Sequence, residues 1–459
     1  MMSRFLKSRG SLFCFLAILT WTAVQSVMGL IQLLGICPSN NPMYTVTGSF
    51  NNPGPYGGFI AIGMAASMAW LVLIHPIKWK DYSIIDKTIT VLSLMVLFIG
   101  ILVLPSTFSR AAWLAFAISI LVLLMKESSV LHYLKRHRLL AFLSVLIILL
   151  VASGVFLLKP MSALGRLHIW RIESLSIMEK PFTGHGSGSI LVSYSDTQAK
   201  FFQTKERSNL TVQVAGCPEY AFNEYLKIGV EYGIPAMAVF IVLVVLSVIS
   251  LIRNKSPLGY GLIVLAVFAL FSYPLSIWQF KAIGLLLLAT VVPDSGKLHY
   301  LNILTLCATV TSSVLLIMNK PKPKENEFRH KYVVGYALHQ EGKYGESNRL
   351  LKEGAAISSD PMFHIIIGKN LEAMGDVEGA GREYLHAHYM VPCRLYPLVL
   401  LMEMEVRLGN HAQAIEYADM AIGLHVNKKN PNMVELHNRA LVCADSLKSP
   451  VIINDLLSY

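Results

Sequence analysis

Long apolar runs alternate with short polar segments over the first 320 or so residues of the chain. In a bilayer every backbone amide must be paired within the protein, so each spanning run must be a helix, and about 20 residues cross roughly 30 Å of hydrocarbon. The pattern predicts about nine transmembrane helices, two of them short. Their approximate bounds are 12–35, 56–75, 88–104, 111–125, 139–158, 234–252, 258–273, 277–292 and 301–318.

The composition supports a membrane protein, because 54% of the 459 residues are hydrophobic, 15% are charged and the mean hydropathy is +0.53. The formal net charge of +11 comes from basic residues between the spans. They form no single patch with interleaved aromatics, so nucleic acid is not an expected partner. The six cysteines are scattered without zinc-type spacing, so we expect no metal and no cofactor.

Lysine and arginine gather in alternate loops, and such loops stay in the cytoplasm. The basic residues are Arg4, Lys7, Arg9, Lys78, Lys80, Lys87, Lys126, Lys135, Arg136, Arg138, Arg253 and Lys255. The opposite side then receives the uncharged loop 37–55 and the long stretch 159–219. The first span has a basic start but is too long for a signal peptide and lacks an A-x-A site, so we interpret it as an anchor.

A repeat follows a stiff polar linker that begins at Lys320. Gly342, Gly375 and Gly409 recur at spacings of 33 and 34 residues, each followed by an alanine-bearing helix. This spacing resembles a tetratricopeptide repeat, in which stacked helical hairpins form a concave face suited to a protein partner.

The sequence therefore predicts an all-α chain with a polytopic helical membrane bundle over 1–319 and a large external loop at about 159–219. A linker at 320–327 and a soluble repeat domain at 328–459 complete the division. With nine spans and a cytoplasmic N-terminus, parity places the repeats outside the cytoplasm. One span fewer would invert that placement.

Arg110 begins a hydrophobic helix at the predicted outer surface. An arginine that borders lipid is costly unless it snorkels or is paired. Taken alone, it fits a snorkelling anchor.

Two motifs in the external loop could hold an anion. Arg166 and Arg171 are fixed cations near a glycine-rich turn, and guanidinium groups with exposed backbone amides can cradle a diphosphate. The alternative is an ordinary loop with a solvated charged face. The motifs are Gly165-Arg166-Leu-His-Ile-Trp170-Arg171 and Lys180-Pro-Phe-Thr-Gly184-His185-Gly-Ser-Gly188.

A polar segment with several acidic residues leads into the sixth span. Glu224 and Glu231 are seven residues apart, so they lie near one helical face close to the membrane boundary. The alternative is an amphipathic helix with interfacial tyrosines. The polar residues of interest are Glu219, Asn223, Glu224 and Glu231.

Four short blocks in this order resemble the O-antigen ligase and polymerase superfamily, which also includes lipid-linked oligosaccharide transferases that modify proteins. Together they cover roughly residues 45 to 240. The blocks are Thr47-Gly-Ser-Phe-Asn-Asn52-Pro53, Phe108-Ser-Arg110-Ala-Ala-Trp113, Gly165 to Trp170 with Pro181 to Gly188, and Phe222-Asn-Glu-Tyr-Leu226 with Glu231-Tyr-Gly233.

The resemblance implies a glycosyltransferase of a bacterial inner membrane that needs no metal. It would pass a glycan from a polyprenyl diphosphate carrier to a hydroxyl of a glycan, lipid or protein acceptor outside the cytoplasm. Arg110 and Arg166 match arginines that act on the diphosphate, whose growing negative charge an arginine can stabilise at any working pH. We expect Asn223 and Glu231 to take part in catalysis with them. We expect substrate contacts from Trp170, Arg171, His185 and Glu224.

The general base departs from the family pattern. Relatives have His-Asn where this chain has Phe222-Asn223, and phenylalanine cannot take a proton. Glu219 is favoured as a substitute because it lies one helical turn before Asn223. A branch with another base and an inactive protein are the alternatives. The candidate bases are Glu219, Glu224, Glu231 and His185.

Two other function classes fit a chain of this kind. A glycan-lipid transporter should carry polar residues near the middle of its spans, where this sequence has few. In a membrane-anchored scaffold only the repeats would act. The five spans before the long loop are fewer than a complete ligase should have, which fits either a truncated start or a compact variant.

Overall fold

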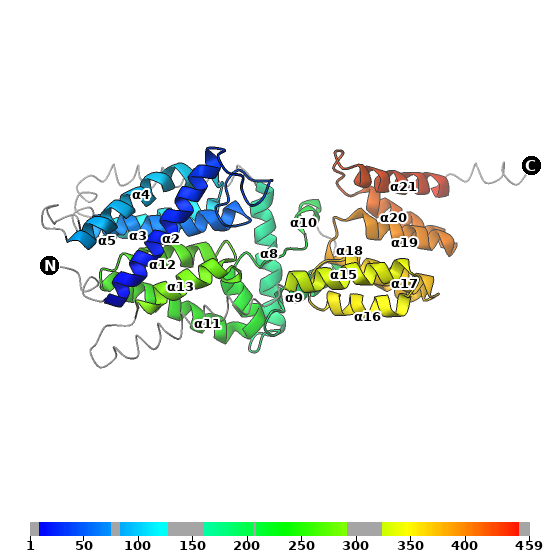
Figure 1. Cartoon of the computed structure of the whole chain (residues 1–459). Helices are drawn as coiled ribbons and strands as arrows, with labels where there is room; N and C mark the ends of the chain where they lie inside the picture. The colour runs from blue at the N-terminus through cyan, green and yellow to red at the C-terminus, as the bar shows by residue number, and fades with distance from the viewer. Residues whose placement is uncertain (1–8, 75–82, 127–159, 205–207, 292–323, 449–459) are drawn as a thin grey trace, which may run out of the picture. The chain divides into compact units, whose positions relative to one another are not determined.

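The computed structural model describes residues 9–74, 83–126, 160–204, 208–291 and 324–448 (Figure 1). Every regular element in these ranges is a helix, which confirms the all-α prediction. The chain divides into two compact units. The first comprises the described residues of 1–159, 222–228 and 235–320, and the second those of 160–221, 229–234 and 321–459.

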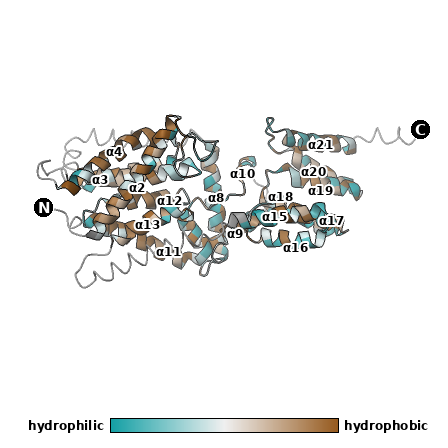
Figure 2. Ribbon diagram, in the orientation of Figure 1, coloured by the Kyte–Doolittle hydropathy of each residue, from teal (hydrophilic) through white to brown (hydrophobic). Residues whose placement is uncertain are grey.

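The first unit is a bundle of apolar helices, drawn largely in brown in Figure 2. Four of the described helices are long and apolar enough to cross a membrane, while α12 and α13 are shorter. The spans predicted at 139–158 and 301–318 lie outside the described residues, so the total of about nine stays a prediction. The elements are α2 (Arg9–Leu33), α3 (Pro53–Ile74), α4 (Ile84–Ser106), α5 (Arg110–Lys126), α11 (Glu224–Arg253), α12 (Leu258–Ala269), η2 (Pro274–Ser276) and α13 (Trp278–Ala289).

Helix α3 lies at the centre of this bundle, against α2, α4, α5 and α12. Its glycines permit close approach: a Cβ added at Gly63 would lie 2.3 Å from the Thr22 side chain, and one at Gly58 would lie 2.6 Å from the Phe268 ring. Helices that share lipid as solvent associate through such small residues, because apolar burial gains little there.

The second unit contains the helices of the predicted external loop together with the repeats. The stretch expected as a loop is mostly helical. Its elements are α8 (Pro160–Glu179), α9 (Ile190–Gln203) and α10 (Asn209–Val214). The repeat elements are α15 (Lys324–Gln340), α16 (Tyr344–Ala355), α17 (Met362–Ala373), α18 (Val377–Met390), α19 (Leu395–Arg407), α20 (His411–Ile422) and α21 (Pro431–Lys448).

Three glycines turn one repeat helix into the next. Gly342, Gly375 and Gly409 have φ of 74°, 88° and 75°, the left-handed conformation that ends many helices and that glycine adopts without a Cβ penalty. The 33- and 34-residue spacing in the sequence therefore marks the hairpin turns. The domain division at 319 and 328 stays a prediction, since residues 292–323 are not described.

Helix α9 joins the loop helices to the repeats, because it packs on α18. The Gln198 side chain donates a hydrogen bond to the carbonyl of Met390, and the Ser359 hydroxyl donates to the carbonyl of Pro218 at 3.3 Å. Residues about 190 positions apart in the chain thus meet in one buried contact.

We expect Asn370→Ala to destabilise the packing of α17 against α15 and α16. The Asn370 amide donates to Ser347 and Asn348, both at 2.8 Å, and accepts from His339 at 2.6 Å, inside a fully buried site. Leaving buried partners unpaired should cost about 2 kcal/mol. Amide hydrogen exchange in α16 and α17 measures this loss in the full chain. The exposed Asn432→Ala is the matched control, and equal protection in both variants would contradict the expectation.

Candidate active site

The turn between α8 and α9 docks on a break in α11. Gly233 interrupts that helix with φ 86° and ψ 173°, and Pro235 has no amide hydrogen to donate to the Glu231 carbonyl. The break therefore leaves two carbonyls and one amide without helical partners. The turn supplies all three: the amide of His185 donates to the Val230 carbonyl at 2.8 Å, that of Gly186 to Glu231 at 3.0 Å, and that of Ile234 to Pro181 at 2.7 Å.

Two glycines make this close approach possible. A Cβ on Gly184, whose φ is 67°, would lie 2.4 Å from the backbone of Glu231 and Tyr232. A Cβ on Gly233 would lie 2.6 Å from the Phe182 backbone. Backbone atoms cannot move aside as a flexible side chain can, so both positions require glycine. The glycine-rich segment is a docking turn, and it brings His185 beside the buried Glu231.

The imidazole of His185 is oriented by α8. Its Nε2 lies 2.9 Å from the carbonyl oxygen and 3.3 Å from the hydroxyl of Ser176. Because a carbonyl only accepts, this contact assigns the proton of the neutral ring to Nε2 and the lone pair to Nδ1.

Helix α8 also carries the predicted cation pair. Arg166 and Trp170 are half-buried and lie one turn apart, so they share a face. Arg171 is exposed and its guanidinium lies 4.9 Å from the centre of the Phe201 ring of α9. That cation–π contact holds Arg171 in place.

A buried polar network between α8 and α9 was not predicted from the sequence. The Gln198 carbonyl oxygen accepts from Tyr194 at 2.6 Å and from His168 at 2.8 Å, while the Gln198 amide donates to the Gly216 carbonyl at 3.0 Å. Burial lowers the pKa of His168, so its ring is neutral near pH 7. The i, i+4 spacing of Tyr194 and Gln198 on an amphipathic helix was the available signal.

Arg110 occupies the first position of α5 in the first unit, where it is half-buried. Phe108, just before it, has φ 48°, a backbone strain rare for a bulky residue. Between them the Ser109 hydroxyl donates to the Gly54 carbonyl at 3.1 Å. The structure therefore brings together the first two sequence blocks, which lie about 55 residues apart.

Asn223 is the N-cap of α11. Its Oδ1 accepts from the amides of Tyr225 and Leu226 at 3.0 and 3.1 Å, and the side chain is 7% exposed. Phe222 before it has φ 53° and its ring meets Tyr273 edge-on at 5.4 Å. The block that resembles the family signature is thus a helix start held in a strained conformation.

The Glu224 carboxylate accepts a hydrogen bond within the first unit. Its Oε1 accepts from the Leu275 amide at 2.5 Å, and its Oε2 lies 3.7 Å from the Lys227 ammonium. This buried carboxylate ties the start of α11 to η2.

Glu219 is exposed, and residues 215–223 are not helical. The argument that it lies one helical turn before Asn223 is therefore wrong, since proline at 218 and the N-cap at 223 start the helix later. Whether Glu219 takes a proton stays a prediction.

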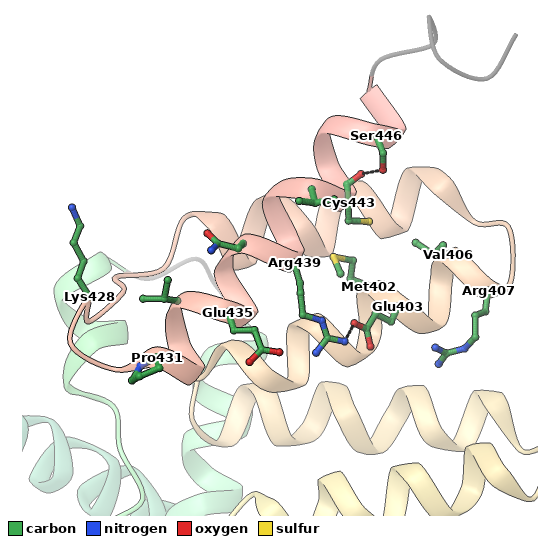
Figure 3. Close-up of a pocket in the computed structure, with 13 residues that line it drawn as sticks. Met402, Glu403, Val406, Arg407, Lys428, Pro431, Glu435, Arg439, Cys443 and Ser446 are labelled. Atoms are coloured by element: carbon green, nitrogen blue, oxygen red, sulfur yellow. Dashed lines mark hydrogen bonds and ion pairs between the residues drawn. The ribbon is translucent and has the colours of Figure 1, made fainter. Parts of the chain in front are cut away.

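Each unit contains a cavity. In the first unit, an apolar cavity of about 550 Å³ lies between α11 and α12, with Asn223 and Tyr225 among its lining residues. In the second, a cavity of about 1070 Å³ lies between α19 and α21 (Figure 3). Arg439 points toward Glu403 across it and forms an ion pair. Among the described residues, no group of three or more His, Cys, Asp or Glu side chains is arranged to hold a metal ion.

Residues 94–241 match the family model described as O-Antigen ligase. No curated protein matches the chain. Among solved structures, the Yersinia enterocolitica type III secretion chaperone SycD, in complex with a peptide of the translocator YopD, is 22% identical, with 27% of this chain and 93% of that chain covered and a TM-score of 0.25. PcrH from Pseudomonas aeruginosa is 18% identical, with coverages of 27% and 94% and a TM-score of 0.25.

The match includes the second, third and fourth sequence blocks, and the first block lies before it. It supports a membrane glycosyltransferase-like function in general terms. It also agrees with the apolar helices in assigning the chain to a bacterial membrane.

We expect Gly184→Ala to undock the turn. The new Cβ must displace the backbone at Glu231, so the amides of His185, Gly186 and Ile234 should lose protection from hydrogen exchange. Gly216→Ala is the control, because an added Cβ there meets nothing within 4 Å. Unchanged protection in Gly184→Ala would show that the turn is held in another way.

Proposed function

We propose that this chain, whose residues 94–241 carry the O-antigen ligase domain, transfers a glycan from a polyprenyl diphosphate carrier to an acceptor hydroxyl outside the cytoplasm, without a metal. The observation that carries the proposal is the docked turn within the matched segment. It fixes His185 against the backbone of the buried Glu231, next to helix α8, which carries Arg166 and Arg171.

In this proposal Arg110 and Arg166 bind the diphosphate. As the glycosyl bond breaks, negative charge grows on the departing lipid diphosphate, and fixed guanidinium groups stabilise it more than they stabilise the donor. Arg110 begins α5, two residues after Phe108, whose φ of 48° is strained. Arg166 lies within α8. We assign contacts with the glycan to Trp170, one turn from Arg166 on the same face, and to Arg171, which lies against Phe201.

We assign the general base to His185. Its Nε2 proton is held on Ser176, so Nδ1 is the basic atom that can accept the acceptor's hydroxyl proton. Glu224 is less suited, because its carboxylate already accepts from Leu275. Glu231 then supports the turn, and Asn223 offers its Nδ2 to substrate while Oδ1 caps α11. Glu219 is the rival base.

We propose that the second unit lies outside the cytoplasm. The packing of α8 to α10 with the repeats in one compact unit supports their placement on one side of the membrane. If the basic loops are cytoplasmic, this side is outside the cytoplasm, which is where lipid-linked glycans would be joined to acceptors.

We expect Arg110→Ala and Arg166→Ala each to lower glycan transfer by about 10² to 10³-fold, the usual loss when one charge-stabilising donor is removed. Lysine at either position should restore part of the rate, because it keeps the charge but not the bidentate fork. The measurement is the glycan profile of a deletion strain carrying each variant, with membrane levels checked by immunoblot.

Arg382→Ala is the matched control, since that arginine is exposed and pairs only one turn away with Glu378. Wild-type glycan from both alanine variants at positions 110 and 166 would contradict the proposal. Transport of glycan-lipid without bond formation, or complementation by the repeats alone, would then be favoured.

The base assignment has its own test. His185→Ala should lower the transfer rate of the purified protein by about 10² to 10⁴-fold. Ser176→Ala should have little effect, because the carbonyl that holds Nε2 is retained. Glu219→Gln should stay near wild type. A large loss in Glu219→Gln together with an active His185→Ala would transfer the role to Glu219.

A further inference from the structure

Two cysteines from distant parts of the chain lie side by side in the second unit. The Cys393 thiol donates a hydrogen bond to the carbonyl of Ala215 at 3.5 Å. The Arg394 guanidinium donates to the sulfur of Cys217, also at 3.5 Å. Each sulfur thus contacts a residue within two positions of the other cysteine. The contact joins the segment after α10 to the turn between α18 and α19.

The surroundings favour a bond between them. Both cysteines are half-buried and pack on the same small cluster of Ala199, Met390 and Val391. Burial raises the pKa of both thiols, and the Arg394 guanidinium opposes that rise in part. The segment around Ala215 and Cys217 is not helical, which leaves it able to adjust by the small amount that disulfide geometry requires.

We propose that Cys217 and Cys393 form a disulfide that fastens the repeats to the loop helices. The proposal rests on the placement of this unit outside the cytoplasm, where disulfides form and persist. The bond would close about 176 residues of chain and fix the contact between Gln198 and Met390. No sequence motif pointed to this pair, since the two cysteines are scattered in the chain and meet only in the fold.

A protein disulfide serves as the oxidant and leaves as a dithiol. The Cys217 thiolate, beside Arg394, attacks one oxidant sulfur and forms a mixed disulfide, releasing the first oxidant thiolate. The Cys393 thiolate then attacks the Cys217 sulfur and releases the second. Two electrons pass from the cysteine pair to the oxidant, and the two cysteine protons end on its two thiols.

The test uses the full chain in membranes, with a protease site inserted after Pro321. Free thiols are first blocked with N-ethylmaleimide during denaturation. After cleavage, we expect the two fragments to migrate together on a non-reducing gel and to separate with reductant. Cys217→Ser and Cys393→Ser should each release the fragments. Cys443→Ser is the control and should leave them joined.

Fragments that separate without reductant in the wild type would overturn the proposal. Purified protein treated with a disulfide oxidant then identifies the cause. Linkage only after this treatment means that the unit lies in a reducing compartment, while no linkage means that the sulfurs do not meet. Glycan transfer is measured separately, so a joined but inactive chain would reject the proposed function and retain the disulfide.

Discussion

The break in α11 is the constraint on which the candidate site depends. Where a buried helix is interrupted, its unpaired amides and carbonyls must form hydrogen bonds with other partners. Here Gly233 and Pro235 create the need, and the turn of 181–186 meets it with three backbone bonds. Those backbone bonds fix the position of residue 185, provided that glycine stays at 184 and 233, and Ser176 then orients the imidazole.

Features that depend on local backbone conformation could be predicted from the sequence, while contacts between distant segments could not. Glycines with positive φ were visible as turns, and Gly342, Gly375 and Gly409 all occupy hairpin turns because a left-handed backbone is a local property. Apolar runs predicted the described bundle for a similar reason, as burial in lipid acts on each span separately. The partner of a freed carbonyl is not local, so the docking of residue 184 on residue 231 could not be predicted.

The partners of the acidic residues could not be predicted from the sequence. Glu219 and Glu224 were singled out by helical spacing, yet the helix begins at residue 224 and the Glu224 carboxylate pairs with the Leu275 amide. A pattern of charges reports that a residue is polar and not what it faces. The network around Gln198 was missed for the same reason, because its carbonyl partners come from segments about 18 and 192 positions away.

The fold divides labour between its two units. In the apolar bundle, the hydroxyls of Ser109 and Tyr225 hold the blocks around Arg110 and Asn223 by donating to backbone carbonyls. In the second unit, Gln198 and the residues near Cys217 connect the segment of α8 to α10 to the repeats. Because α9 packs on both α8 and α18, a change in the repeats that displaces α9 should also displace α8, which carries Arg166.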